Sequence, residues 1–400
     1  MLSDKSRPIV EATLPDLQER INEITPKFYD RMLSERTDLL DGMFSRVDQI
    51  KGKQPRALAA SIPFFANYIL ANPDDYPDEI LLRVAHKHAS LGVPRHEYET
   101  VYKYLFEAIK EDFGDDYTPE FEEAWTEVYW LMADVLIKLE DGLYNIQANN
   151  QHFAPFKLIK CEETGKDVLD MTFEAADGTP MTKALAGQYI SIVTKTTDGL
   201  RQPRQFSLLP SKANERRIAV KVLADGEISP RLKELEIGDI VDISNPYGDV
   251  TADKTDSTLH RPLYIFTSGI GIAPALSYVH RIAVTDPKRT VIAVHRDKSL
   301  ETWPLREEYV NMVEGLENGK VISFLEAPDE GTFTGDLNMR KIEVIPGSFA
   351  FMCGSITFMQ NARSKLINGG VPGRNIQYEI FGADELMHQG TRRAMHRRRY

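Results

Sequence analysis

Cysteine is scarce in this chain of 400 residues, which contains only Cys161 and Cys353. Two cysteines cannot build a disulfide framework, and no pair has the CxxC spacing of a metal site, which is typical of a reducing cytoplasm. The chain also lacks the basic start and apolar core of a signal peptide. No apolar run approaches the roughly 18 to 20 residues that span a membrane. These absences predict a cytoplasmic protein without stable membrane insertion.

Positive charge is also in deficit. The chain has 48 Lys and Arg residues against 60 Asp and Glu, so its formal net charge is -12. An acidic protein repels the phosphates of nucleic acids unless a basic stripe offsets that charge. The basic concentration in the tail, residues 388–400, is explained more simply as a solvated extension than as a binding arm. We therefore expect no nucleic-acid partner, and a monomer whose partners are small molecules.

Three successive patterns predict a multidomain protein. Over residues 1–148 glycine is sparse and apolar residues recur with the period of a helix, which predicts an all-α domain. Over 152–256, short alternating runs separated by turn residues predict a small antiparallel β-barrel or sandwich. Over 261–387, apolar strands alternate with helical segments, which predicts a parallel sheet of βαβ units. A linker is expected at 251–261, and the basic tail follows the last domain.

The helical region contains one histidine of special interest. Apolar residues recur at helical spacing in residues 80–98, which predicts a helix that turns His88 toward the interior and His86 almost the opposite way. Pro94 places His88 in the last turns of that helix. A histidine on an apolar face is commonly a hydrogen-bonded core residue, and the alternative is a ligand of haem iron.

Two further residues favour the ligand interpretation. Tyr98 follows His88 by ten residues, and the spacing of Leu136, Glu140 and Leu143 puts Glu140 beside the apolar stripe of a long helix. A carboxylate and a phenol that reach the far ring nitrogen of His88 would fix its tautomer and increase its donor strength.

The predicted barrel carries a candidate flavin site. In residues 204–207, Arg-Gln-Phe-Ser, the Arg and Ser can hold phosphate oxygens while Phe206 offers a flat face for a flavin ring. This tetrapeptide alone is weak evidence, but Tyr189 precedes it and residues 226–229 follow. Ser229 can open a helix onto a pyrophosphate.

The parallel-sheet region carries a candidate dinucleotide site. Residues 268–274, Ser-Gly-Ile-Gly-Ile-Ala-Pro, lie between an apolar strand and a helical run, where glycines permit close approach to phosphates. Cys353 and Gly354 end a later strand at the carboxyl edge of the same sheet. Cys353 is equally well explained as a small buried hydrophobe. Phe381 can cover a flavin face, although a core Phe is the default interpretation.

These motifs occur together in an order that resembles the flavohaemoglobins: HKH in the helical region, RQFSL in the barrel, and SGIGIAP, CGSITFM and YEIFG in the last domain. The resemblance covers nearly the whole chain. It implies a globin that holds haem b, followed by a ferredoxin-reductase-like module whose β-barrel binds FAD and whose α/β domain binds NAD(P)H. It also implies nitric oxide dioxygenase activity, in which nitric oxide, oxygen and NADH or NADPH give nitrate.

The resemblance assigns roles around the haem by motif. His88 is the expected iron ligand, with Tyr98 and Glu140 as its hydrogen-bonding pair. Lys87 matches a residue that tunes communication between haem and flavin. On the distal face the motifs point to four residues: Tyr29, Phe44, Gln54 and Leu58.

The resemblance also assigns residues to the other two cofactors. For FAD they are Tyr189, Arg204, Gln205, Phe206 and Ser207, to which the pattern of residues 226–229 adds Gly226 and Ser229. For the nicotinamide coenzyme they are Gly269, Ile270, Gly271, Ile272, Ala273, Pro274, Cys353 and Gly354. The contact zone between flavin and nicotinamide is expected at Glu379, Ile380, Phe381, Gly382 and Ala383.

Two positions depart from the family pattern. Phe206 stands where the family usually has Tyr, so stacking is kept while a hydroxyl contact to the flavin is lost. Ala383 stands where the family commonly has Pro, next to the Phe381 that is expected to gate nicotinamide access.

Other functions remain open at this level. The chain can act mainly as an NAD(P)H-dependent flavin or ferric reductase with weak globin activity, or as a haem-based oxygen or nitric oxide sensor. The mixed charges of Arg296, Asp297 and Lys298 would serve either NADH or NADPH.

Overall fold

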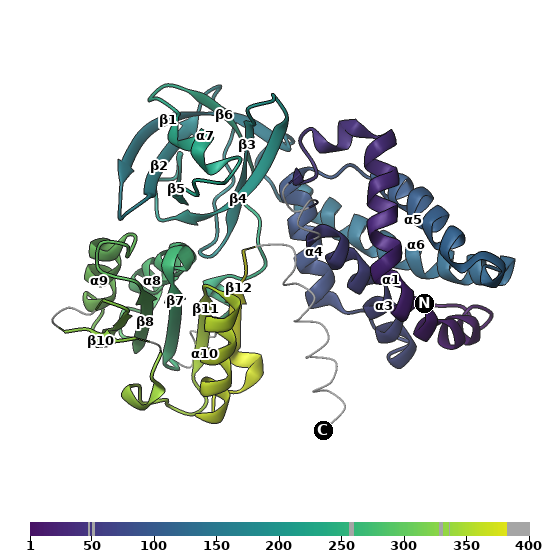
Figure 1. The fold of residues 1–400 in the computed structure, drawn as a ribbon. Coiled ribbons are helices and arrows are strands. Elements are labelled where there is room, and N and C mark those ends of the chain that lie inside the picture. Colours follow the sequence, from purple (N-terminus) through teal and green to yellow (C-terminus); the bar gives the residue numbers. More distant parts are fainter. Residues whose placement is uncertain (47–48, 50–52, 256–259, 328–330, 336, 382–400) are drawn as a thin grey trace. The chain divides into compact units, whose positions relative to one another are not determined.

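The computed structural model describes residues 1–46, 49, 53–255, 260–327, 331–335 and 337–381. These residues form two compact units (Figure 1). The helical unit comprises Met1–His152 and Thr197–Pro203, and the sheet unit comprises Phe153–Thr196 and Arg204–Phe381. None of the helices in these residues is long and apolar enough to cross a membrane.

The helical unit is all-α, as the sequence predicts. Its α-helices include α1 (Arg7–Glu35), α3 (Lys53–Ala71), α4 (Asp78–Leu91), α5 (Glu97–Phe113) and α6 (Pro119–Asn145), with 3-10 turns η1 (Thr37–Leu40) and η2 (Gly114–Asp116). Helix α6 begins at a proline, and the Thr118 hydroxyl oxygen accepts a hydrogen bond from the Phe121 N–H at 3.2 Å. Phe28, Phe65 and Trp125 are among the largest side chains buried in this unit.

Helix α4 places His88 in its last turn, as predicted. The helix ends at Leu91, and Gly92 caps it in the left-handed conformation with φ +66°. A β-carbon at Gly92 would lie 3.0 Å from the His152 side chain, so glycine suits this position for both its conformation and its size.

The predicted buried face of α4 is wrong in detail. Its buried stripe contains Leu81, Ala85 and Ala89, and His86 is only 8% exposed. His88 lies at the edge of that stripe, with a side chain that is 32% exposed. Small alanines permit close packing of α4 against α6, whereas the sequence pattern gave more weight to the larger side chains on the neighbouring face.

The sheet unit begins with a closed six-stranded antiparallel barrel in the order β1-β2-β5-β4-β3-β6. The strands are β1 (Phe153–Glu163), β2 (Val168–Ala175), β3 (Tyr189–Lys195), β4 (Arg201–Leu209), β5 (Glu215–Lys221) and β6 (Ile240–Ser244). Leu158, Phe173, Ile192 and Ile218 fill the interior. The alternation that the sequence shows is therefore the inward and outward alternation of barrel strands.

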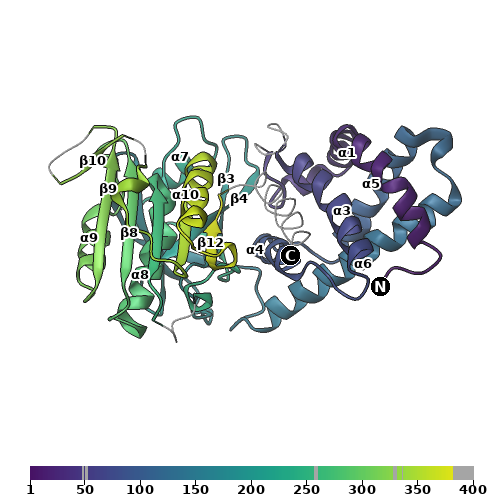
Figure 2. The same ribbon diagram turned by 90° about the horizontal axis from the view of Figure 1, so that it is seen from below.

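A six-stranded parallel sheet follows, in the order β10-β9-β8-β7-β11-β12. The strands are β7 (Leu263–Ser268), β8 (Val291–Asp297), β9 (Gly319–Leu325), β10 (Phe333–Thr334), β11 (Phe349–Cys353) and β12 (Ile376–Glu379). Helices α8 (Ile272–Thr285) and α9 (Arg306–Glu314) cover one face, and α10 (Ile356–Asn368) covers the other (Figure 2). The strand order reverses between β7 and β11, which is where open α/β sheets bind ligands.

Within the sheet unit, the barrel and the parallel sheet share one hydrophobic core. Leu209 and Val250 from the barrel side pack into the same cluster as helix α8. The linker predicted over residues 251–261 is therefore wrong for its first part, because Thr251 and Ala252 are buried. The turn residues of this segment suggested exposure, but its apolar Ala and its backbone hydrogen bonds join it to the core.

Two glycines provide a test of the packing with opposite expected signs. A β-carbon at Gly271 would lie 2.3 Å from the backbone oxygen of Cys353, so Gly271→Ala should lower the free energy of unfolding by about 1–3 kcal/mol. Gly142 lies inside α6 with no neighbour in reach of a β-carbon, so Gly142→Ala should raise it by about 0.5–1 kcal/mol. Scanning calorimetry of both variants checks the signs, and an undiminished stability of Gly271→Ala would contradict the close approach.

Candidate functional site

Three helices bring His88, Tyr98 and Glu140 together in the helical unit. The His88 Nδ1 lies 2.9 Å from the Glu140 Oε1 and 3.0 Å from the Tyr98 hydroxyl. The Tyr98 hydroxyl donates to the same Glu140 oxygen at 2.6 Å. The Tyr129 hydroxyl in turn donates to the Tyr98 carbonyl at 2.6 Å, which fixes the start of α5 against α6. The three residues that the sequence analysis associates therefore form one hydrogen-bonded triad.

The protonation of this triad follows from burial and charge. Glu140 is only 3% exposed, and burial together with the Glu140 carboxylate raises the pKa of Tyr98. Tyr98 therefore stays protonated and acts as a donor. Because the carboxylate can only accept, the His88 Nδ1 carries the proton that points toward it, and the lone pair lies on Nε2.

The free nitrogen of His88 suits a particular kind of metal. No residue in the described ranges hydrogen-bonds the His88 Nε2, whereas Nδ1 has two partners. The described residues also contain no group of three or more His, Cys, Asp or Glu side chains arranged to hold a bare metal ion. A single oriented imidazole fits a metal that brings its other ligands with it, as haem iron does.

The predicted distal residues are only partly described. Tyr29, in α1, is 8% exposed, and burial raises the pKa of its hydroxyl, which has no hydrogen-bonding partner among the described residues. The rings of Tyr29 and Phe44 meet edge to face with centroids 5.9 Å apart. Leu58 is half-buried in α3, and the Gln54 side chain lies outside the described residues. The buried hydroxyl of Tyr29 is therefore available to a bound ligand.

The candidate flavin residues gather on neighbouring barrel strands. Tyr189 pairs with Tyr247 across an antiparallel bridge, and Ser207 is buried on β4, next to β3 in the barrel. The Arg204 guanidinium lies 4.0 Å from the Glu227 carboxylate. The side chains of Gln205 and Phe206 are half-buried.

Residues 226–229 form a tight turn into a short helix. The Gly226 N–H donates to the Leu223 carbonyl at 2.9 Å, and the Ser229 hydroxyl oxygen accepts from the Leu223 N–H at 3.0 Å. Helix α7 (Ser229–Lys233) begins at Ser229, as the sequence predicts. Because the serine oxygen accepts this bond, its O–H remains a donor for a phosphate oxygen.

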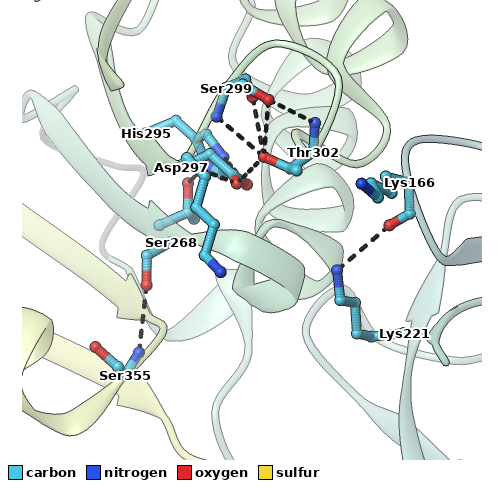
Figure 3. A network of polar contacts seen from close by, with 10 residues as sticks. Lys166, Lys221, Ser268, His295, Asp297, Ser299, Thr302 and Ser355 are labelled. Atoms are coloured by element: carbon cyan, nitrogen blue, oxygen red, sulfur yellow. Dashed lines mark hydrogen bonds and ion pairs between the residues drawn. The ribbon is translucent and has the colours of Figure 1, made fainter. Parts of the chain in front are cut away.

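The glycine loop and the Cys353–Gly354 turn meet at the carboxyl edge of the sheet. The Ser268 hydroxyl accepts a hydrogen bond from the Ser355 N–H at 3.3 Å (Figure 3). A β-carbon at Gly354 would lie 2.2 Å from the Ser268 hydroxyl oxygen, so a larger residue here would displace the Ser268 side chain. Cys353 is fully buried, as its hydrophobe interpretation expects. The two loops lie at the topological switch point, where the sequence analysis expects the dinucleotide.

The last predicted contact residues follow β12. Glu379 ends that strand opposite Cys353, Ile380 packs against the core, and Phe381 is 47% exposed. Phe381 is thus not the core residue of the default interpretation. Gly382, Ala383 and the basic tail lie outside the described residues.

A polar network at the end of β8 was not expected from the sequence. His295 is fully buried and stacks on Trp303 with ring centroids 4.4 Å apart, and burial lowers its pKa, so it is neutral. The Asp297 carboxylate accepts from the Thr302 hydroxyl at 2.6 Å and the Lys298 N–H at 2.7 Å (Figure 3). The sequence gives one indication of the contact between His295 and Asp297. The two residues are two positions apart on a buried strand, so their side chains lie on the same face.

This network changes the interpretation of the mixed charges after β8. Asp297 is only 8% exposed and its carboxylate is engaged by its own loop. Arg296 donates to Glu326 at 3.0 Å, while the Lys298 side chain is exposed. Of the three residues, Asp297 is therefore the one whose side chain is held inside its own loop.

Comparisons with known proteins match both halves of the chain. Residues 26–136 match the globin family and residues 155–251 match the oxidoreductase FAD-binding domain. The flavohemoproteins of Oceanobacillus iheyensis and Bacillus subtilis are each 32% identical to the chain over 96% of its length, and the matches cover 97% and 98% of those relatives.

Solved structures give the same result. The flavohemoglobin of Malassezia yamatoensis, determined with bound FAD and heme, superposes with a TM-score of 0.92 at 48% identity. That match covers 95% of this chain and 100% of the other. The FAD/NAD-binding domain of a Vibrio cholerae nitric oxide dioxygenase shares the fold over 58% of this chain and its own full length, with a TM-score of 0.53 at 24% identity. The globin fold, the FAD-type barrel and the parallel sheet thus occur in the same order as in these relatives, and the matches cover nearly the full length of both chains. The chain therefore belongs to the flavohemoprotein family.

Proposed function

We propose that this chain is a nitric oxide dioxygenase, which consumes nitric oxide, oxygen and NADH or NADPH to give nitrate. The observation that carries the proposal is the His88–Glu140–Tyr98 triad in a chain that also contains the complete two-domain oxidoreductase fold. The Malassezia relative, with its bound FAD and heme, supports the same cofactors here. The Vibrio neighbour, the FAD/NAD-binding domain of a nitric oxide dioxygenase, shares the fold of the domains that would supply the electrons.

We assign the cofactors to domains as follows. Haem b belongs to residues 1–148, FAD to 152–256 and the nicotinamide coenzyme to 261–387. When bound, the coenzyme supplies hydride, FAD divides its two electrons into single transfers, and haem activates oxygen. We place the protein in the cytoplasm, as a monomer.

On the proximal side, His88 would hold the haem iron through Nε2. The Glu140 carboxylate accepts a hydrogen bond from the Nδ1–H and so increases the electron donation of the ring, while the Tyr98 hydroxyl donates to the same buried carboxylate. Lys87 is half-buried on the same helix turn, where its charge would favour electron arrival at the haem.

On the distal side, the Tyr29 hydroxyl would donate a hydrogen bond to the negative charge that develops on oxygen during the reaction. Phe44 holds the Tyr29 ring from the side and would wedge the haem. Gln54 and Leu58 would complete the distal side.

In the sheet unit, the side chains and backbone hold and orient the two other cofactors. Tyr189, Phe206 and the phosphate-holding pair Arg204 and Ser207 would bind FAD, with Gln205, Gly226 and Ser229 alongside. The glycine loop of residues 269–274 and the turn at Cys353 and Gly354 would hold the coenzyme phosphates. Glu379, Ile380 and Phe381, followed by Gly382 and Ala383, would control how nicotinamide reaches the flavin.

Spectra of the cofactor-loaded protein test the proposal. NADH added without oxygen should reduce both the flavin and the haem bands. Nitric oxide added with oxygen should then accelerate NADH oxidation and yield one nitrate per nitric oxide. Flavin bands without haem, or NADH oxidation that is indifferent to nitric oxide, would instead favour a flavin or ferric reductase.

The identity of the iron ligand can be checked with the same substitution at two neighbouring histidines. His88→Gln should reduce the bound haem at least about tenfold, because ligand and supporting contacts are lost together. His86→Gln should keep a full haem content, since the Tyr98–Glu140 pair orients His88 and not His86. The pyridine haemochrome assay measures both, and a haem-replete His88→Gln protein would exclude His88 as the ligand.

The role of Tyr29 can be separated from the electron supply. Tyr29→Phe should slow nitric oxide consumption about 100-fold, the scale for losing one preorganised donor, and leave flavin reduction by NADH unchanged. Tyr104→Phe is the matched control, because it removes a hydroxyl that donates to Glu35 at 2.7 Å instead. Stopped-flow measurement of both steps decides, and an unchanged rate in Tyr29→Phe would refute the assignment.

A further inference from the structure

A short segment that precedes the bulk of β4 belongs to the helical unit. This segment, Thr197–Pro203, packs with Met1–His152 and contains Gln202, which has no exposed surface. A buried polar side chain is costly unless its hydrogen-bonding groups are satisfied. The partners of Gln202 therefore show what the segment does.

Both the nitrogen and the oxygen of the Gln202 side-chain amide hydrogen-bond to backbone groups. Its Nε2 donates to the Leu40 carbonyl at 2.6 Å and to the Phe44 carbonyl at 3.1 Å. Its Oε1 accepts from the Arg46 N–H at 3.1 Å. One side chain thus ties together three backbone groups within seven residues, 40–46.

The backbone and charges around Gln202 support the same attachment. The Gly42 N–H donates to the Arg201 carbonyl at 2.7 Å, and the Arg201 N–H donates to the Asp41 carboxylate at 2.6 Å. The Arg46 guanidinium pairs with the Asp198 carboxylate. Residues 40–46 are therefore held by a segment that lies more than 150 positions further along the chain.

The held segment carries an aromatic residue of the candidate haem pocket. The Phe44 carbonyl is one of the groups that Gln202 binds, and the Phe44 ring packs edge to face on Tyr29. The Phe44 N–H donates to the Leu39 carbonyl at 3.0 Å, so the residue is fixed from both ends of its backbone. Its ring position, and through it that of Tyr29, follows from where residues 40–46 are held.

We propose that Gln202 is a positioning residue for the distal side of the haem, which sets the Phe44 and Tyr29 rings by clamping residues 40–46. Gln202 itself does not touch the reacting atoms and acts through the Phe44 backbone. The inference rests on the proposed function, because it takes Tyr29 as the group that acts on bound oxygen.

The test uses the full-length, cofactor-loaded protein with three substitutions. Gln202→Met keeps the length of the side chain and removes all of its hydrogen bonds, and Gln202→Asn keeps the amide on a shorter stem. Gln18→Met makes the same change at an exposed position of α1 and serves as the control. Hydrogen exchange of residues 39–46 reports the clamp, and the C–O stretching band of the carbon monoxide complex reports the distal pocket.

In Gln202→Met we expect the backbone amide protons of residues 39–46 to exchange about tenfold faster than in the wild type, which is the effect expected when the hydrogen bonds of one buried amide are lost. Its C–O band should shift or broaden and nitric oxide consumption should fall about tenfold, with haem content and flavin reduction unchanged. Gln202→Asn should lie between Gln202→Met and wild type, and Gln18→Met should match wild type.

Three results would overturn the inference. If residues 39–46 exchange in Gln202→Met at the wild-type rate, Gln202 does not clamp them. If they exchange faster but the C–O band is unchanged, Gln202 holds the segment without affecting the distal pocket. If Gln202→Met does not fold, Gln202→Asn is judged by the same two criteria. A wild-type protein that takes up no haem would overturn the proposed function as well, whereas a normal wild type with an unaffected variant overturns this inference alone.

Discussion

The helical unit depends on one buried carboxylate. Removing Glu140 from water costs several kcal/mol, and only well-placed donors can offset that cost. The two donors come from different helices, His88 from α4 and Tyr98 from α5, while Glu140 lies on α6. The charge therefore fixes three helices relative to one another and, through the tautomer of His88, decides which nitrogen remains free. The buried Glu140 carboxylate thus accounts both for the packing of the three helices and for the free Nε2 of His88.

The sheet unit reaches its site geometry without a comparable buried charge. There the close approach of the backbone to its neighbours is decisive: at Gly271 a β-carbon would overlap the Cys353 carbonyl, and at Gly354 it would overlap the Ser268 side chain. The polar groups near this edge are largely satisfied among themselves, as Asp297 shows. The glycine turn leads directly into helix α8 at this edge, and the backbone N–H groups of a helix N-terminus recognise phosphate without depending on a mobile side chain.

Sequence patterns were sufficient for features that depend on local spacing. The helix before Pro94, the stripe with Glu140, the barrel alternation and the glycine loop after a buried strand all follow from periods of 3.6 or 2 and from turn residues. The sequence pattern misplaced the buried face of α4 for a physical reason. Ala85 and Ala89 each bury little area, but their small side chains allow the helix to pack closely on that face. Resemblance, rather than spacing, connected His88 with Tyr29, since nothing local joins α1 to α4.

Gln202 marks the limit of such patterns. It lies between Arg201 and Pro203, where no local spacing indicates a buried side chain, and its complete burial results from contacts with residues 40–46 far away in sequence. A carboxylate at this point would face two carbonyl oxygens with no proton to give, and an ammonium would leave the Arg46 N–H without an acceptor. A neutral amide, which donates and accepts at once, satisfies all three backbone groups at no cost of buried charge. The same reasoning applies at Glu140. There a carboxylate, which only accepts, polarises the His88 ring, whereas the Gln202 amide both donates and accepts and so holds the backbone of residues 40–46.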